Sequence, residues 1–154
     1  MLTSKYFVWI IENKIGGMPH PEVFGNLAEN LDNLRKNHKI GIIINLTERP
    51  IDEYELKQRD ILYFHIPIED FTAPTMDQLL HFKDIYESAQ NPIAVHCYAG
   101  MGRTGTILAA ALVIEGSTPE NAIISVRAKR PGSIENDEQK ESIFKFYEVL
   151  NNKK

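Results

Sequence analysis

The sequence predicts a single-domain α/β protein in which helices flank a central, mostly parallel sheet of four to five strands. Three observations carry this prediction. β-Branched runs alternate with helical patterns along the chain, and a glycine-rich loop joins an apolar strand to an apolar helix. In addition, 154 residues with 43% hydrophobic content can bury one sizeable core. We therefore expect residues 1–154 to form one domain.

The first quarter of the chain is expected to contain a strand, a loop and a helix. Residues 6–11 are apolar enough for a first strand, and the glycines and prolines of residues 16–21 predict a loop. The helix that follows shows apolar residues at helical spacing, at Leu27, Leu31 and Leu34.

Two further strands and a capped helix follow. The β-branched run 40–46 suits a fully buried strand, and residues 60–67 predict another after a charged, partly helical connection. Thr75 and Gln78 form a capping-box pattern that opens a helix. The apolar face of this helix carries Leu79, Phe82, Ile85 and Ala89.

The C-terminal half is expected to contain one strand and three helices. Residues 93–95 are apolar and β-prone, and residues 104–115 are small and aliphatic. Thr118 and Pro119 start a short helix that runs to about Lys129. The last helix covers residues 137–150 and turns Ile143, Phe146 and Leu150 inward.

The turn between residues 93–95 and 104–115 has the composition of an anion site. Glycines at positions 100, 102 and 105 let successive N–H groups face inward, and the following helix adds its positive end to the same point. Cys97, the only cysteine of the chain, begins this turn. An anion bound there would lie against its sulfur.

Cys97 and Arg103 together suit attack on a phosphate ester. A helix N-terminus and a nearby guanidinium favour the nucleophilic thiolate over the thiol. The planar guanidinium of Arg103 can grip two phosphate oxygens at once and stay with them as the transferring group flattens.

Three other interpretations of this turn compete with a catalytic one. A lone cysteine is commonly an inert core residue. The glycines also match a dinucleotide-binding fingerprint, but that site needs a second strand ending in an acidic residue, and Thr118 opens a helix instead. A phosphate-binding module without turnover remains the third alternative, although such a module usually lacks the cysteine or the arginine.

The motif from His96 to Gly105 contains His96-Cys97, then five residues, then Arg103-Thr104-Gly105. This motif resembles the signature of the cysteine-dependent protein tyrosine phosphatases, specifically the small dual-specificity type. The resemblance covers most of the chain and includes residues 66–70, 127–135 and 138–139. It implies a phosphatase-like fold with the phosphate-binding loop between strand and helix. It also implies a phosphocysteine intermediate on Cys97.

Asp70 is the expected general acid and base. It follows a strand end and begins a non-helical loop that could reach over the phosphate, and the resemblance puts the family's acid at this position. Its neighbour Glu69 could be confused with it. We expect the Thr104 hydroxyl to donate a hydrogen bond to the leaving sulfur, and the resemblance implies that Gln139 positions the attacking water.

The resemblance also assigns the remaining residues of the loop. His96 would orient the loop through hydrogen bonds to its backbone. The phosphate would be bound by the segment made of Tyr98, Ala99, Gly100, Met101 and Gly102.

The substrate class expected from these residues is a phosphorylated protein or peptide. Residues 98–102 contain no lysine or histidine, whereas relatives in the family that hydrolyse inositol lipids have basic residues there. For a chain of this length, the resemblance implies a shallow pocket open to phosphotyrosine, phosphoserine and phosphothreonine. Residues 15–20 would form part of the rim. A tyrosine-only phosphatase stays an alternative, because a few rim side chains could deepen the pocket.

Cofactors and partners are limited by composition. The five histidines show no paired ligand spacing, so we expect no metal and no cofactor. The net charge of −4 disfavours nucleic acid, apart from a local basic patch around Arg127, Lys129 and Arg130. No run approaches the eighteen apolar residues of a membrane span. We expect a cytoplasmic monomer, because a nucleophilic thiol needs a reducing compartment, and inhibition by phosphate or vanadate.

Overall fold

The strand that leads into Cys97 lies at the centre of the sheet. The computed structural model describes residues 2–99 and 101–152 and contains one five-stranded sheet in the order β1-β2-β5-β3-β4. β1 and β2 are antiparallel, and the other neighbours are parallel. The predicted α/β fold is confirmed. The strands are β1 (Val8–Ile11), β2 (Ile15–Met18), β3 (Ile42–Asn45), β4 (Leu62–His65) and β5 (Ile93–His96).

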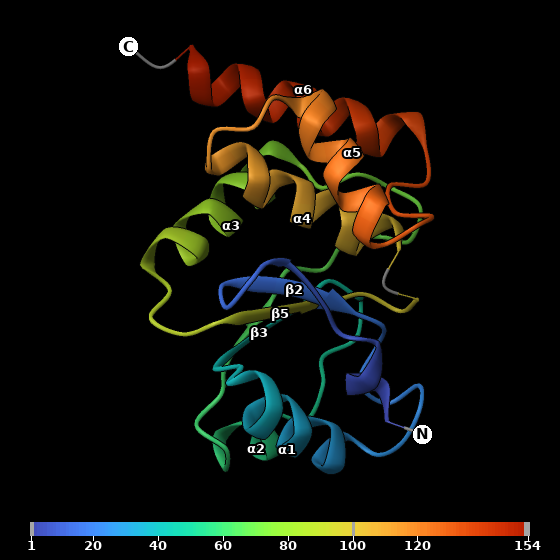
Figure 1. Ribbon diagram of the computed structural model, residues 1–154, viewed down its shortest axis with the longest axis vertical. Helices are drawn as coiled ribbons and strands as arrows, with labels where there is room; N and C mark the ends of the chain where they lie inside the picture. The colour runs from blue at the N-terminus through green and yellow to red at the C-terminus, as the bar shows by residue number, and fades with distance from the viewer. Residues whose placement is uncertain (1, 100, 153–154) are drawn as a thin grey trace.

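Helices cover both faces of the sheet (Figure 1). One face carries α1 (Leu27–His38) and α2 (Glu53–Lys57), with the short 3-10 helix η1 (Thr3–Tyr6) beside α1. The opposite face carries the four remaining helices, which are α3 (Met76–Ser88), α4 (Gly102–Ile114), α5 (Pro119–Lys129) and α6 (Asp137–Asn151).

Two hydrophobic clusters separate these layers because strand side chains alternate between the faces. In β3, Ile42 and Ile44 pack into the cluster under α3 to α6, whereas Ile43 packs into the cluster under α1 and α2. All three are at most 2% exposed. The continuous apolar run in the sequence therefore corresponds to a parallel strand buried on both faces.

The loop predicted for residues 16–21 is wrong over its first half. Gly16 and Gly17 belong to β2, which pairs with β1 on one side and β5 on the other. A Cβ at Gly16 would approach the carbonyl oxygen of Val8 to 2.5 Å, and one at Gly17 would approach Leu108 Cδ1 to 2.8 Å. These glycines permit close packing of a central strand and do not mark a turn.

Helix caps follow the sequence closely. The predicted capping box is confirmed: the Thr75 hydroxyl accepts from the Gln78 N–H at 3.1 Å, and the Gln78 side chain accepts from the Thr75 N–H at 2.9 Å. Asn136 caps α6 by accepting from the Gln139 N–H at 2.9 Å.

Of the basic patch considered for residues 127–130, Arg127 and Lys129 are exposed, whereas Arg130 is not. Arg127 donates to the carbonyl oxygens of Ser133 and Ile134, and Lys129 donates to that of Ile10. Arg130 is buried, with 7% of its surface exposed. Arg127 and Lys129 thus stay at the surface while they satisfy backbone carbonyl oxygens, which need donors where water is excluded. Within the part of the chain that the structure describes, no helix has the length and apolar character needed to cross a bilayer.

Candidate active site

Cys97 lies at the carboxyl end of the central strand β5. All four residues of β5 are buried, and Cys97 directly after them is 3% exposed. α4 begins at Gly102, and its first turn is closed by a hydrogen bond of 2.9 Å from the Gly105 N–H to the Met101 oxygen. The positive end of a 13-residue helix therefore faces the segment that carries the cysteine.

A cavity of about 90 Å³ brings most of the predicted site residues together. The catalytic candidates Cys97, Arg103 and Asp70 line it, although Asp70 lies 27 positions before the cysteine in the sequence. The other lining residues are Phe71, Tyr98, Ala99, Met101, Gly102 and Glu135. Gly100, predicted to bind phosphate, lies outside the described residues.

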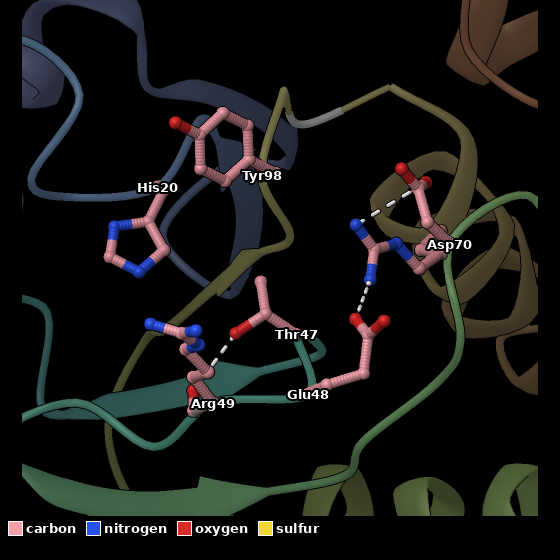
Figure 2. Close-up of a pocket in the computed structure, with 7 residues that line it drawn as sticks. His20, Thr47, Glu48, Arg49, Asp70 and Tyr98 are labelled. Carbon is pink, nitrogen blue, oxygen red and sulfur yellow. Dashed lines mark hydrogen bonds and ion pairs between the residues drawn. The ribbon is translucent and has the colours of Figure 1, made fainter.

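Arg103 is held on one side and open on the other. It is 4% exposed, and its Nη1 donates to Glu48 Oε1 and to the Ile68 carbonyl oxygen, both at 2.9 Å. Its Nη2 lies 3.3 Å from Asp70 Oδ1, and its Nε has no hydrogen-bond partner among the described residues. The Glu48 and Asp70 carboxylates approach from two sides (Figure 2). The Nε–Nη2 edge therefore retains donors for an incoming oxyanion.

Asp70 lies on a loop that the first turn of α6 holds in place. The Asp70 carboxylate is 53% exposed, and it accepts from the Phe71 N–H at 3.0 Å. Asn136 Nδ2 donates to the Phe71 carbonyl oxygen at 2.7 Å, and Gln139 Nε2 donates to that of Thr72 at 3.3 Å. The carboxylate is thus exposed at the mouth of the cavity while the backbone behind it is fixed.

His96 contacts the backbone of the Cys97 loop from within the protein core. It is fully buried, and its Nδ1 lies 3.2 Å from the Cys97 carbonyl oxygen. Because a carbonyl only accepts, this contact assigns the proton to Nδ1. Burial, followed by the nearby His20, lowers the pKa of His96 to about 3. A neutral histidine therefore orients the backbone at the cysteine.

Thr104 and Gln139 lie one layer behind the cavity. Thr104 is fully buried in α4, and its hydroxyl has no partner among the described residues. Gln139 is also fully buried, and its Oε1 accepts from the Glu135 N–H at 2.7 Å. A Cβ at Gly102 would meet Gln139 Nε2 at 2.9 Å and collide with the Glu135 carboxylate. A side chain at position 102 would therefore displace the ends of the Glu135 and Gln139 side chains.

A second, larger cavity of about 380 Å³ adjoins the first, because Asp70, Tyr98 and Arg103 line both. Its other lining residues are His20, Thr47, Glu48 and Arg49 (Figure 2). Within the rim predicted for residues 15–20, Ile15 and Met18 are buried and His20 lines the cavity. The rim prediction is thus wrong for most of that segment, because residues 15–18 form β2, a buried strand between β1 and β5.

Sequence reasoning missed Glu48, Arg49 and Glu135. Glu48 and Arg49 follow the run 40–46 after one intervening residue, and this run contains β3, the strand beside β5. In parallel sheets, residues outside the carboxyl ends of neighbouring strands share one crevice, so this position was a usable signal. Glu135 had no comparable local signal.

Metal ligands are not grouped in this part of the molecule. Among residues 2–99 and 101–152, no three His, Cys, Asp or Glu side chains are placed to hold one metal ion. The charged groups described at the cavity are those of Arg103, Asp70 and Glu135.

Comparisons with known proteins identify the family of the chain. Residues 16–117 match the family described as "Polymorphic toxin system, DSP-PTPase phosphatase". The human dual specificity protein phosphatase CDC14C is 34% identical over 111 residues, which cover 71% of this chain and 25% of that protein. The Candida albicans tyrosine-protein phosphatase CDC14 is 30% identical over 134 residues, covering 83% and 23%. The chain thus spans about a quarter of the length of these relatives.

A solved structure shows the same arrangement of elements. The crystal structure of Tk-PTP in the active form superposes with a TM-score of 0.81 at 29% sequence identity. The superposition covers 93% of this chain and 97% of that one.

Proposed function

Because the chain belongs to the small dual-specificity type of the cysteine-dependent protein tyrosine phosphatase superfamily, we propose that it is a phosphoprotein phosphatase. It hydrolyses phosphotyrosine, phosphoserine and phosphothreonine, and residues 1–154 act as one catalytic domain. The observation that carries the proposal is the convergence of Cys97, Arg103 and Asp70 on one cavity from segments far apart in the sequence.

In the first step, the Cys97 thiolate attacks phosphorus in line with the leaving oxygen. A sulfur–phosphorus bond forms as the phosphorus–oxygen bond breaks, and protonated Asp70 gives its proton to the departing oxygen. Arg103 holds two phosphate oxygens through Nε and Nη2, and the N-terminus of α4 stabilises the charge that develops. The product is a phosphocysteine.

In the second step, water attacks the phosphocysteine. Asp70, now a carboxylate, takes a proton from this water, and the sulfur–phosphorus bond breaks to release inorganic phosphate and the thiolate. The Thr104 hydroxyl donates to the departing sulfur. The family resemblance assigns the positioning of this water to Gln139, whose amide lies next to the loop of Asp70, between the Glu135 N–H and the Thr72 oxygen.

The proposed substrate range rests on an open pocket mouth. Tyr98 is 65% exposed at the point where the two cavities meet, and no basic side chain stands between Tyr98 and Gly102. A panel of phosphotyrosine, phosphoserine and phosphothreonine peptides, with a soluble phosphoinositide as the fourth arm, distinguishes dual specificity from tyrosine-only activity. Preferred hydrolysis of the phosphoinositide would contradict the proposed substrate class.

The first prediction concerns turnover itself. The purified protein is expected to hydrolyse an aryl phosphate in the presence of a chelator, with inhibition by phosphate or vanadate. Cys97→Ser is expected to abolish turnover while vanadate binding, measured by calorimetry, persists. Binding without turnover in the wild type would instead indicate a phosphate-binding module, and a requirement for metal would contradict the cysteine mechanism.

The second prediction separates Asp70 from its neighbour. Asp70→Asn is expected to lower kcat about 100-fold on phenyl phosphate, whose leaving group needs a proton, and much less on p-nitrophenyl phosphate. Glu69→Gln is the matched control, because Glu69 is also an exposed acid, one position earlier. Equal losses of Asp70→Asn on both esters would remove Asp70 from the acid role.

Two further parts of the proposal concern the cellular state. We infer a reducing compartment such as the cytoplasm, because a nucleophilic thiolate with no second cysteine in the chain has no intramolecular disulfide to protect it. We also infer that the catalytic unit acts as a monomer on phosphorylated proteins. Gel filtration with light scattering measures that state directly.

A further inference from the structure

We propose that the 380 Å³ cavity is a second subsite, in which Arg49 binds an anionic side chain next to the phosphorylated residue of the substrate. This inference rests on the proposed function, since it names the substrates that the same site prefers. The shared chemistry of the ligand is an oxyanion, either the carboxylate of Asp or Glu or the phosphate of a second phosphorylated residue.

The position of the cavity suits a flanking residue. It shares Asp70, Tyr98 and Arg103 with the smaller cavity that contains Cys97. An extended peptide advances about 3.4 Å per residue, so a substrate whose phosphate lies at Cys97 places its next one or two residues here. Figure 2 shows His20, Arg49 and Tyr98 at one end of this cavity, with Asp70 and Glu48 at the other.

The charges of the cavity leave Arg49 available. Its two carboxylates, from Glu48 and Asp70, are both paired with Arg103. Arg49 is exposed and forms no ion pair with any residue the structure describes. Both carboxylates of the cavity are thus paired with Arg103, whereas Arg49 has no ion-pair partner among the described residues. Such a cavity attracts an anion.

The backbone of Arg49 is fixed before any substrate binds. Its carbonyl oxygen accepts from Asn45 Nδ2 at 2.8 Å and from the Thr47 hydroxyl at 2.9 Å. Asn45 Oδ1 in turn accepts from the Thr47 N–H at 2.8 Å. Asn45 is the last residue of β3, so this loop is tied directly to the sheet. A preorganised loop loses less freedom on binding, which favours a specific contact.

His20 adds a neutral donor at the same end. Its Nδ1 accepts from the Glu22 N–H at 3.1 Å, which assigns the proton of the neutral ring to Nε2. Burial lowers the pKa of His20, partly offset by Glu22. Near neutral pH this end of the cavity therefore offers the Arg49 guanidinium and one neutral N–H donor. A carboxylate or phosphate can accept hydrogen bonds from both.

The test compares matched phosphotyrosine peptides that differ in the residue flanking the phosphotyrosine. The peptides carry Glu, Gln, Lys or a non-hydrolysable phosphonate at that position, in one set before the phosphotyrosine and in a second set after it. The wild type is expected to show a kcat/KM about five-fold higher for Glu than for Gln. A larger preference for the phosphonate over Glu identifies a second phosphate as the better ligand, and the reverse identifies a carboxylate.

Arg49 variants decide whether this residue is responsible. Arg49→Gln is expected to bring the Glu-to-Gln ratio to about one, and Arg49→Glu is expected to favour the Lys peptide. Lys57→Gln is the matched control, because Lys57 is exposed on α2 and does not line the cavity. It is expected to keep the wild-type ratio. An unchanged ratio in Arg49→Gln, or no preference in an active wild type, would overturn the subsite.

Failure of the subsite and failure of the proposed function give different results. An active enzyme with equal rates on all peptides overturns the subsite and leaves the phosphatase proposal standing. If the wild type hydrolyses no peptide and no aryl phosphate, the phosphatase proposal fails. The affinities of Cys97→Ser for the same peptides then test Arg49 independently, and equal affinities would overturn the subsite as well.

Discussion

Arg103 meets two opposing requirements at one side chain. A guanidinium that is 4% exposed needs partners, because an unpaired buried charge is strongly destabilising. Glu48 and the Ile68 carbonyl supply them at Nη1. The opposite edge, with Nε unpartnered among the described residues, stays available for phosphate. The ion pair to Glu48 therefore positions the phosphate-binding edge without occupying it.

Removing the Glu48 carboxylate should weaken phosphate binding. Without it, Nη1 keeps the Ile68 oxygen alone, and the guanidinium can turn away from its binding orientation. Glu48→Ala is expected to lower kcat/KM on an aryl phosphate about tenfold, mostly through KM. Steady-state kinetics measure this split. Glu53→Ala, at an exposed carboxylate of α2, is the control, and identical kinetics in the two variants would show that Glu48 has no positioning role.

At the scale of elements, α6 links the end of the chain to the acid loop. Asn136 caps α6 through Oδ1 and holds the Phe71 carbonyl oxygen through Nδ2. Gln139, one turn into the same helix, holds the Thr72 oxygen. The loop of Asp70 is thus anchored by a helix that begins 67 residues after Asp70 in the sequence. Its position depends on the tertiary packing of α6.

Asn136 should affect both stability and catalysis. Asn136→Ala is expected to lower the free energy of unfolding by about 1 kcal/mol, as for loss of other N-caps. It should also lower kcat on phenyl phosphate several-fold, because the acid loop loses an anchor. Asn26→Ala is the matched control, since Asn26 caps α1 by accepting from the Glu29 N–H at 2.8 Å. Urea denaturation should show similar destabilisation in both variants, whereas steady-state kinetics should show the loss of kcat in Asn136→Ala alone. Similar kinetics in the two variants would disprove the anchor.

Local signals predicted most elements correctly and failed where packing decides. The capping box of Thr75 and Gln78 is read from four residues, and the structure confirms it. Gly16 and Gly17 carry the same local signal as a turn. They lie instead in a strand, which has glycine at these positions because Phe7, Val8 and Leu108 leave no space for a Cβ there. No local pattern contains that information.

Prediction of the site from the sequence has a similar limit. The motif from Cys97 to Arg103 is contiguous, so the sequence predicts it directly. Glu48 and Arg49 become site residues because β3 pairs with β5, a choice made by strand order over the whole sheet. Strand order depends on contacts between residues distant in sequence. The expectation of four to five strands therefore could not specify which loops meet.

For the whole molecule, burial of histidines couples stability to pH. Burial lowers the pKa of His96 to about 3 and also lowers the pKa values of His20 and His38. An unfolded chain restores the ordinary value of about 6.5. Between pH 6.5 and 3 the unfolded state therefore binds more protons than the folded state. The folded state is favoured fully above pH 6.5 and loses stability as the pH falls.

Acidification from pH 7 to pH 5 is expected to lower the free energy of unfolding by about 2 kcal/mol through His96 alone. His20 and His38 change stability in the same direction. Urea denaturation at several pH values measures the slope, and His96→Asn should reduce it even if that variant is less stable throughout. A slope unchanged in His96→Asn would show that His96 is not neutral in the folded protein.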